Sequence, residues 1–131
     1  MVISSRRVVI RFLIHSNKWS VWKIMKLTEK ELEIMNVLWR SNGPLTASEI
    51  ITASENRTWK EGSVYIIMKM LLKKGAVILA MHKPTVSNTA RAYSPTLTAE
   101  EYVIANLASI QKETGIALDI PTLISLLKKV K

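Results

Sequence analysis

The sequence contains no cysteine among its 131 residues, which excludes disulfide bonds, cysteine-ligated metal sites and thiol catalysis. Glycine and proline are also scarce, with four of each, and phenylalanine occurs once. Charged residues interrupt every apolar stretch well before it reaches the roughly 20 residues that span a bilayer. We therefore expect no stable membrane insertion and a cytoplasmic location.

Motifs of catalysis and of metal binding are missing as well. The sequence has no glycine-rich phosphate loop, no Ser/His/Asp set and no paired-carboxylate motif. Its two histidines, His15 and His82, lie far apart without carboxylates at ligand spacing. We predict that the protein is not an enzyme and that it carries neither a metal ion nor a cofactor.

What the sequence does contain is typical of a folded, basic protein. Hydrophobic residues make up 48% of the chain and charged residues 22%, at a length that suits one compact domain with an accessory element. The formal net charge is +9, which favours a polyanionic partner such as nucleic acid.

The positive charge is concentrated at the N-terminus. Residues 1–24 contain five basic residues and no acidic one, so residues 25–131 carry a net charge of +4. We interpret residues 1–24 as a basic N-terminal extension. Two alternatives are open: translation starts at Met25, which directly precedes the first strong helix signal, or the extension associates with a membrane surface.

Three segments begin with one pattern, in which Leu-Thr is followed by a glutamate three residues after the threonine. The pattern starts at Leu27, Leu45 and Leu97. It places the threonine at a helix N-cap, the glutamate where it can bond back to the cap amide, and the leucine against an apolar residue five positions on. The sequence therefore predicts three helices at these points.

The first two of these helices and a third one form a predicted helix-turn-helix. The first helix is predicted to stop at Asn42-Gly43-Pro44, where Gly43 can take the left-handed conformation, and the second follows within a few residues. The third helix is predicted to begin around Trp59 and to end at Gly75. Its apolar stripe, which we expect to be buried, consists of Val64, Ile67, Met68 and Leu71.

The sequence after Gly75 predicts a β-hairpin, with strands at Ala76–His82 and Thr89–Ser94 and a turn at Lys83–Asn88. Three helices followed by a hairpin is the order of a winged helix, whose third helix enters the major groove of DNA. We predict a mainly α fold with a small β-hairpin, in which residues 25–95 form a winged helix-turn-helix domain.

Residues 96–131 are predicted to form a helical dimerisation segment. A helix that starts after Thr98 breaks at Gly115, and a second helix starts around Pro121. This apolar pair has no core of its own, so pairing with a second copy is the natural way to bury it. The residues expected in that contact are Tyr102, Ile104, Leu107, Leu123, Leu126 and Leu127.

The candidate DNA-binding residues lie on the outward side of the third helix, at the start of the second helix and on the hairpin. Hydroxyl groups and lysines can bond to phosphates or bases, and an isoleucine can contact a thymine methyl group. The candidates are Thr46, Lys60, Ser63, Tyr65, Ile66, Lys69, Lys73, Lys83 and Arg91. For three residues a purely structural interpretation is the alternative to a DNA contact. Thr46 then serves only as a helix cap, Trp59 is a core residue that does not stack on the DNA, and Lys74 is a solvated lysine.

Several of these segments resemble the penicillinase-repressor family of bacterial regulators (the BlaI/MecI/CopY type). The resembling residues are Leu27–Glu31, Val37–Trp39, Leu45–Ile50, Trp59 and Leu71–Gly75. The resemblance implies a winged-helix homodimer that binds double-stranded DNA at a palindromic operator and represses transcription. In one branch a membrane sensor triggers cleavage in the C-terminal region, which implies a sensor protease as a further partner; here Asn106-Leu107 lies in that region without a recognisable cleavage motif.

The third helix departs from the family pattern. Where polar and basic residues are usual, this sequence has Gly62, Tyr65, Ile66 and Met70, and it has no arginine, the commonest reader of guanine. We expect a different operator or weaker specificity. An alternative function is a winged-helix protein-interaction module with weak or lost DNA binding. The absence of cysteine disfavours the copper-responsive branch.

Overall fold

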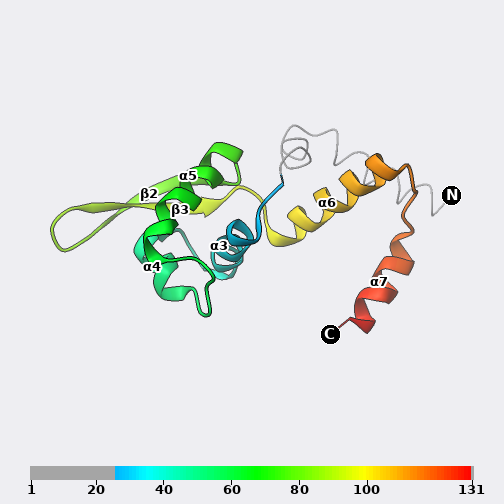
Figure 1. Cartoon of the computed structure of the whole chain (residues 1–131), viewed down its shortest axis with the longest axis horizontal. Helices are drawn as coiled ribbons and strands as arrows, with labels where there is room; N and C mark the ends of the chain where they lie inside the picture. The colour runs from blue at the N-terminus through cyan, green and yellow to red at the C-terminus, as the bar shows by residue number, and fades with distance from the viewer. Residues whose placement is uncertain (1–25, 131) are drawn as a thin grey trace. The chain divides into compact units, whose positions relative to one another are not determined.

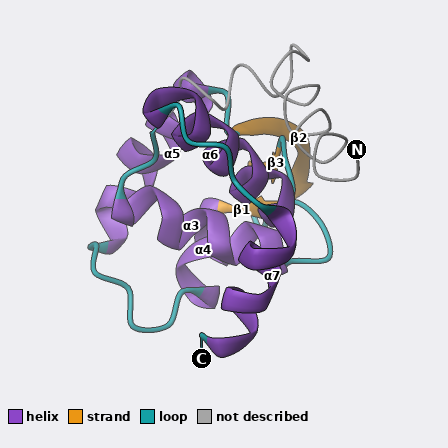
Figure 2. Ribbon diagram, turned by 90° about the vertical axis from the view of Figure 1, so that its right-hand side faces the viewer, coloured by secondary structure: helices purple, strands orange, loops and turns teal. Residues whose placement is uncertain are grey.

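The structure, a computed structural model, describes residues 26–130 (Figures 1 and 2). The predictions for residues 1–24 fall outside the described residues. The elements in chain order are α3 (Glu29–Arg40), β1 (Leu45–Thr46), α4 (Ala47–Ala53), the 3₁₀ turn η1 (Glu61–Ser63), α5 (Val64–Lys74), β2 (Val77–Pro84), β3 (Thr89–Pro95), α6 (Ala99–Thr114) and α7 (Ile120–Lys129). The predicted class, mainly helical with a small antiparallel sheet, is confirmed.

The chain divides into two compact units, and the first contains residues 25–99. This unit holds α3, α4 and α5 together with the hairpin of β2 and β3, which extends from the helices as a long wing (Figure 1). Thr96 and Leu97 are tied into it, because the Thr96 hydroxyl bonds to the Gly75 carbonyl and the Leu97 carbonyl accepts from the Trp39 indole. We call this first unit the winged-helix unit.

The core of the winged-helix unit lies where its helices meet the base of the wing. Its largest fully buried side chains are Ile34, Met35, Ile50, Val64, Leu71 and Val77. The predicted stripe of α5 is confirmed, since Val64, Ile67, Met68 and Leu71 are all buried. Helix α5 is therefore anchored by one face, and its other face is left for solvent or a partner.

The predicted capping boxes at the starts of α3 and α4 are confirmed. The hydroxyl of Thr28 accepts from the Glu31 amide at 3.2 Å, and the Glu31 carboxylate accepts from the Thr28 amide at 2.8 Å. Thr46 and Glu49 form the same pair of bonds at 3.2 and 2.9 Å. Helix α6 begins at Ala99, directly after Thr98, as the third copy of the pattern predicted.

The prediction of a left-handed Gly43 at the end of α3 is wrong. Helix α3 ends at Arg40 with Ser41 as an extended C-cap, and the positive-φ glycines of the described chain are Gly75 and Gly115. The hydroxyl of Ser41 bonds to both the amide and the carbonyl of Gly43. This local side-chain turn ends the helix, so no left-handed residue is required there.

The predicted start of the third helix is also wrong by several residues. The segment around Trp59 is not helical, and the chain passes through η1 before α5 begins at Val64. Trp59 is buried, and Thr58 is bonded to Glu33 of α3 through both its amide and its hydroxyl. These two anchors hold the connection against α3, so the helix starts only after it.

The sheet has the order β1-β3-β2, with all neighbours antiparallel. Strand β1 was missing from the sequence-based expectation, which assigned Leu45 and Thr46 only to a helix cap. In the structure Leu45 pairs with Tyr93 and Thr46 with Ala92. This pairing joins the start of α4 to strand β3 of the wing, so these two parts of the winged-helix unit lie side by side.

Gly75 ends α5 in the left-handed conformation, with φ of 78°, and its amide and that of Ala76 bond back to Leu72 and Leu71. A side chain at this φ is strained. Replacing Gly75 with alanine is therefore expected to lower the free energy of unfolding by about 1 to 2 kcal/mol. Urea unfolding followed by circular dichroism measures this. Gly62→Ala is the control, because a Cβ there meets no atom within 4 Å, and it should cost almost nothing.

The second unit contains, among the described residues, those from Glu100 to Val130. Helix α6 ends before Gly115, whose φ is 71°, and α7 begins after Asp119, whose carboxylate accepts from the Thr122 amide at 3.2 Å. No residue of α7 is buried, although the helix contains three leucines and two isoleucines. Three of its apolar side chains, Ile124, Leu126 and Leu127, are half exposed or more in the single chain.

Candidate nucleic-acid interface

The outward face of α5 combines exposed apolar side chains with free cations. Tyr65 and Ile66, in the first turn, are 64% and 69% exposed. Lys69 and Lys73 follow one and two turns later and are also exposed. The helix contains no acidic residue, so nothing on it neutralises these lysines.

A hollow of about 600 Å³ lies between the start of α4, the outward face of α5 and the wing. Four of the predicted DNA-binding residues line it: Thr46, Tyr65, Lys69 and Arg91. They come from three elements, since Thr46 precedes α4, Tyr65 and Lys69 belong to α5, and Arg91 belongs to β3. The pairing of β1 with β3 is what brings the first and last of these elements together.

Within the described residues, the cations Lys69, Lys73 and Arg91 are not paired with carboxylates. The ion pairs found within residues 26–130 join Arg57 to Glu61, Lys74 to Glu31, and Lys83 to Glu49. Lys69, Lys73 and Arg91 take part in none of them. Charged side chains that have no protein partner retain their full attraction for a phosphate.

The remaining candidates do not line this hollow. Lys60 is exposed just before η1, and Ser63 is half-buried at the junction of η1 and α5. Ile66 and Lys73 lie on α5, whereas Lys83 lies on β2. The structure therefore does not gather all nine residues into one site.

Thr46 is the least accessible of the candidates. Its side chain is buried, and its hydroxyl accepts the amide of Glu49 in the capping box. These contacts favour the interpretation of Thr46 as a helix cap only. Ser48, which sequence reasoning did not select, is exposed in the first turn of α4 and lines the hollow. Its position two residues after a cap was the signal that could have identified it.

Lys83 is held by a helix rather than projecting freely from the wing. Its ammonium lies 3.1 Å from a carboxylate oxygen of Glu49, at the start of α4. The Thr46 amide and the Lys83 ammonium both bond to that carboxylate, and they lower the pKa of Glu49 below its usual value. Glu49 thus has two functions, capping α4 and tying the wing to it.

Replacing Glu49 with glutamine separates these two functions, because glutamine still completes a capping box but carries no charge to hold Lys83. We expect tighter binding to duplex DNA, by about fivefold at low salt, with a salt dependence steeper by about one ion per protomer. Fluorescence anisotropy over a salt series measures both. The double variant Glu49→Gln/Lys83→Gln is the control, and it should show no gain; a gain there would contradict the assignment.

The interaction between Glu49 and Lys83 also makes the stability of the fold depend on pH, in a direction that follows from the lowered pKa of Glu49. Because the pKa of Glu49 is lower in the folded than in the unfolded chain, its contribution to stability is present above the unfolded value and is lost as the pH falls through the folded value. The difference in stability between wild type and Glu49→Gln should therefore be fully present at pH 7, decline as the pH falls below the ordinary glutamate pKa of about 4.3, and vanish only below the lowered pKa of the folded chain. Thermal unfolding at several pH values tests this.

Trp59 and Lys74 contribute to the packing of the winged-helix unit. Trp59 is only 3% exposed, which confirms its interpretation as a core residue. Lys74 is not simply a solvated lysine: its ammonium lies 2.6 Å from the buried carboxylate of Glu31 and donates to the Lys26 carbonyl. This ion pair joins the end of α5 to the start of α3.

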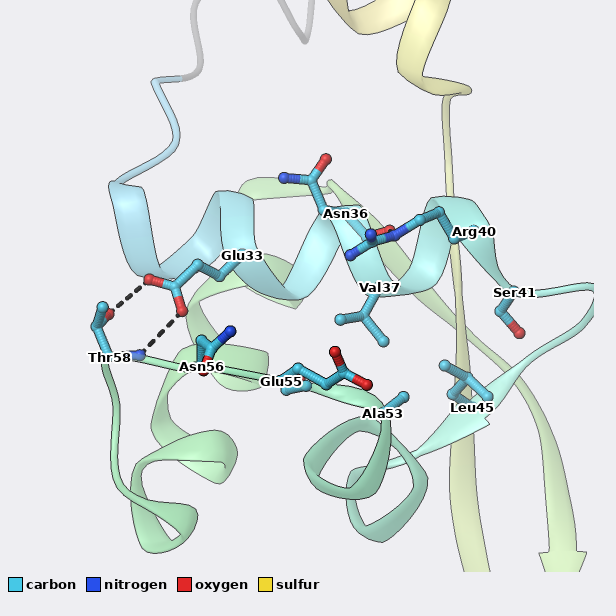
Figure 3. A pocket seen from close by; sticks show the side chains of 11 residues that line it. Glu33, Asn36, Val37, Arg40, Ser41, Leu45, Ala53, Glu55, Asn56 and Thr58 are labelled. Carbon is cyan, nitrogen blue, oxygen red and sulfur yellow. Dashed lines mark hydrogen bonds between the residues drawn. The ribbon is translucent and has the colours of Figure 1, made fainter.

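A second hollow, of about 720 Å³, lies between α3, the end of α4 and the connection to η1 (Figure 3). Glu33 stands at its edge, with both carboxylate oxygens directed at Thr58. Val37, Leu45 and Ala53 supply its apolar side chains, while Arg40 and Glu55 carry opposite charges. The contact of Glu33 with Thr58 positions the connection that leads into α5.

Neither metal-binding clusters nor membrane-spanning helices were found in the part of the chain that the structure describes. Residues 26–130 contain no group of three or more histidine or acidic side chains that could hold a metal ion. The helices described there are too short or too polar to cross a bilayer.

Comparison with known proteins connects this geometry to a family. The profile of the penicillinase repressors matches residues 27–126, which include the whole helix-turn-helix and the wing. The chain belongs to the penicillinase repressor family. The penicillinase repressor of Bacillus licheniformis is 30% identical to it over 81 residues, or 62% of this chain. That match spans 59% of the length of the Bacillus protein.

Proposed function

We propose that this chain is a DNA-binding transcriptional repressor that acts as a homodimer on a palindromic operator. The observation that carries the proposal is the hollow shared by α4, α5 and the wing, with Lys69 and Arg91 on its walls and no carboxylate paired to either among the described residues. In winged-helix proteins this is the side that faces the duplex. Membership of a family of repressors supports the same conclusion.

In this proposal the elements have separate roles. Helix α5 lies in the major groove with Tyr65 and Ile66 towards the bases. Its lysines Lys69 and Lys73 contact phosphates, as do Lys60 and Arg91, and the start of α4 approaches the backbone with Thr46 and Ser48. Lys83 joins these contacts only if it leaves Glu49.

The dimer is supported by the apolar surface of residues 100–130. Leu126 and Leu127 of α7 are more than half exposed in the single chain, as are Val103 of α6 and Ile116 in the linker. Of the other predicted contact residues, Tyr102, Ile104, Leu107 and Leu123 are half-buried. Exposed apolar side chains at this density are typical of a surface that binds a partner. A second copy presents the same surface and gives a two-fold dimer, which matches a palindromic operator.

Cleavage by a sensor protease remains a prediction. The bond between Asn106 and Leu107 lies inside α6, and the side-chain amide of Asn106 donates to the backbone carbonyl of Tyr102 one turn earlier. A protease binds its substrate as an extended strand, so this helix must unwind locally before that bond can be cut.

The test of the proposed function is binding to duplex DNA. In a mobility-shift assay the full chain is expected to retard fragments from the region upstream of its own gene in preference to unrelated fragments of equal length. The preference should persist at physiological salt, where non-specific binding is weak. Equal retention of both fragments at every salt concentration would contradict a sequence-specific repressor.

The dimer is tested separately by sedimentation equilibrium. Leu127→Asp places a charge in the proposed contact and is expected to raise the dissociation constant of the dimer at least tenfold, by roughly 1.4 kcal/mol or more. Ile78→Asp is the matched control, because Ile78 is also about half exposed but lies on β2 in the winged-helix unit. Equal effects of the two changes would count against a dimer formed by α7.

A further inference from the structure

The feature that needs an explanation is an isoleucine at the position where a base-reading side chain is expected. Ile66 is the third residue of α5 and is 69% exposed, on the outward face of the helix. Single exposed apolar residues are common on protein surfaces. This one differs because the first turns of a recognition helix are the part that reaches the base edges.

The surroundings of Ile66 fit a nucleic-acid duplex. Lys69 lies one turn along the same face, Lys73 lies two turns along it, and Arg91 approaches from the wing through the hollow shared with Tyr65. A residue three or seven positions away in a helix lies on the same side. The face is therefore an apolar centre with cations at its margins, which complements a groove that has phosphates on both sides.

Within the major groove one base carries an exposed apolar group, the C5-methyl of thymine. Helix α5 has no arginine, asparagine or glutamine with which to contact guanine or adenine, and the proposed function assigns its exposed lysines to phosphates. Ile66 is also well suited to such a contact, since a β-branched side chain in a helix has one strongly preferred χ1 rotamer. Its γ2-methyl group is thus held in place before binding, unlike the methyl group of the more flexible Met70.

We propose that Ile66 is a specificity-determining residue that selects thymine by packing against its C5-methyl group. The inference rests on the proposed function and adds the chemistry of base selection to it. The lysines and Arg91 then supply affinity through phosphates, and the apolar contact supplies preference for one base. An operator read in this way needs a thymine at a defined place in each half-site.

The experiment removes the methyl group alone. The full chain first selects its preferred duplex from a random pool, and each thymine of that duplex is then replaced, one at a time, by uracil. Uracil keeps every hydrogen-bonding group of thymine and lacks the methyl. At one position in each half-site the replacement is expected to weaken binding by wild type about fourfold, the effect of burying one methyl group.

The variant Ile66→Ala is expected to bind the thymine and uracil duplexes equally at that position. Ile66→Val keeps a branched side chain and should retain most of the preference, and Ile78→Ala, which removes an exposed isoleucine from β2, should retain all of it. Since Ile66 is exposed, its replacement should leave the melting temperature unchanged.

The outcomes separate the two proposals. If no sequence is enriched by the selection, the repressor function fails and this inference fails with it. If a sequence is enriched but contains no thymine whose methyl affects wild-type binding, the inference alone is overturned. The same holds if the uracil effect is as large in Ile66→Ala as in wild type, because a residue other than Ile66 would then contact the methyl group.

Discussion

Replacing Leu71 with alanine is expected to destabilise the winged-helix unit by about 3 kcal/mol, the largest single effect on stability that we predict. Leu71 has no exposed surface and lies in the α5 stripe that packs into the core. The change removes three carbons from a close-packed site and leaves a cavity that the neighbouring helices fill only in part. In a unit of this size the melting temperature should fall by roughly 15 °C.

Leu72→Ala is the matched control for this prediction. Leu72 is the next residue on α5, carries the same side chain and is 37% exposed on the side of the hollow. Its replacement should cost less than about 1 kcal/mol, because part of the side chain is already exposed to water and the space that it leaves opens to solvent instead of forming a closed cavity. Thermal and urea unfolding of both variants measure the contrast. Equal losses would mean that α5 is not anchored by the face seen in the structure.

Reversing the charge of Lys69 is expected to reduce affinity for duplex DNA on the order of 100-fold at physiological salt, or about 2.7 kcal/mol. Lys69 is exposed on the outward face and lines the hollow between α5 and the wing. Glutamate at this position removes one phosphate contact per protomer and brings a carboxylate towards the backbone of the duplex. The slope of log affinity against log salt should become shallower by about two in a dimer.

Lys112→Glu makes the same change in net charge outside the winged-helix unit, on α6. It should alter affinity by no more than about threefold, through the long-range field alone. The melting temperature of Lys69→Glu should match that of wild type, because the side chain is exposed and unpaired among the described residues. If the two glutamate variants lose affinity equally, the outward face of α5 does not touch the duplex.

Together these two residues test the division of α5 into two faces. Leu71 and Lys69 are two positions apart and therefore point to nearly opposite sides of the helix. Leu71→Ala should lower stability and reduce DNA binding only as far as it unfolds the chain. Lys69→Glu should reduce DNA binding at constant stability. The two effects are separable because one face of α5 holds the helix in place and the other is free.

Much of the helical structure could be predicted from the sequence because it depends on neighbours along the chain. The capping boxes at Thr28 and Thr46 join residues three apart, and Gly75 ends α5 through bonds to the preceding turn. The buried stripe of α5 follows from the helical repeat, so Leu71 and Ile67 were assigned to the core correctly. The exposed position of Ile66 followed from the same repeat.

Two of the predictions that failed concern places where tertiary contacts override the local pattern. The third helix was expected from about Trp59, but burial of that side chain and the bonds from Thr58 to Glu33 delay it to Val64. The position of Lys74 in the last turn of a helix predicted an exposed, solvated lysine. In the structure its ammonium is paired with Glu31, 43 residues away in the sequence. A pattern of nearby residues carries no information about partners at that separation.

The sequence by itself thus determined which segments are helices, where most of them begin and end, and which face of each is apolar, because those properties arise from bonds spanning three to five residues. Only the tertiary structure decided that β1 pairs with β3, that Lys83 is held by Glu49, and that Tyr65, Lys69 and Arg91 meet at one hollow. These contacts join segments far apart in the chain. They depend on strand register and helix packing, which are set by the whole core rather than by any one segment.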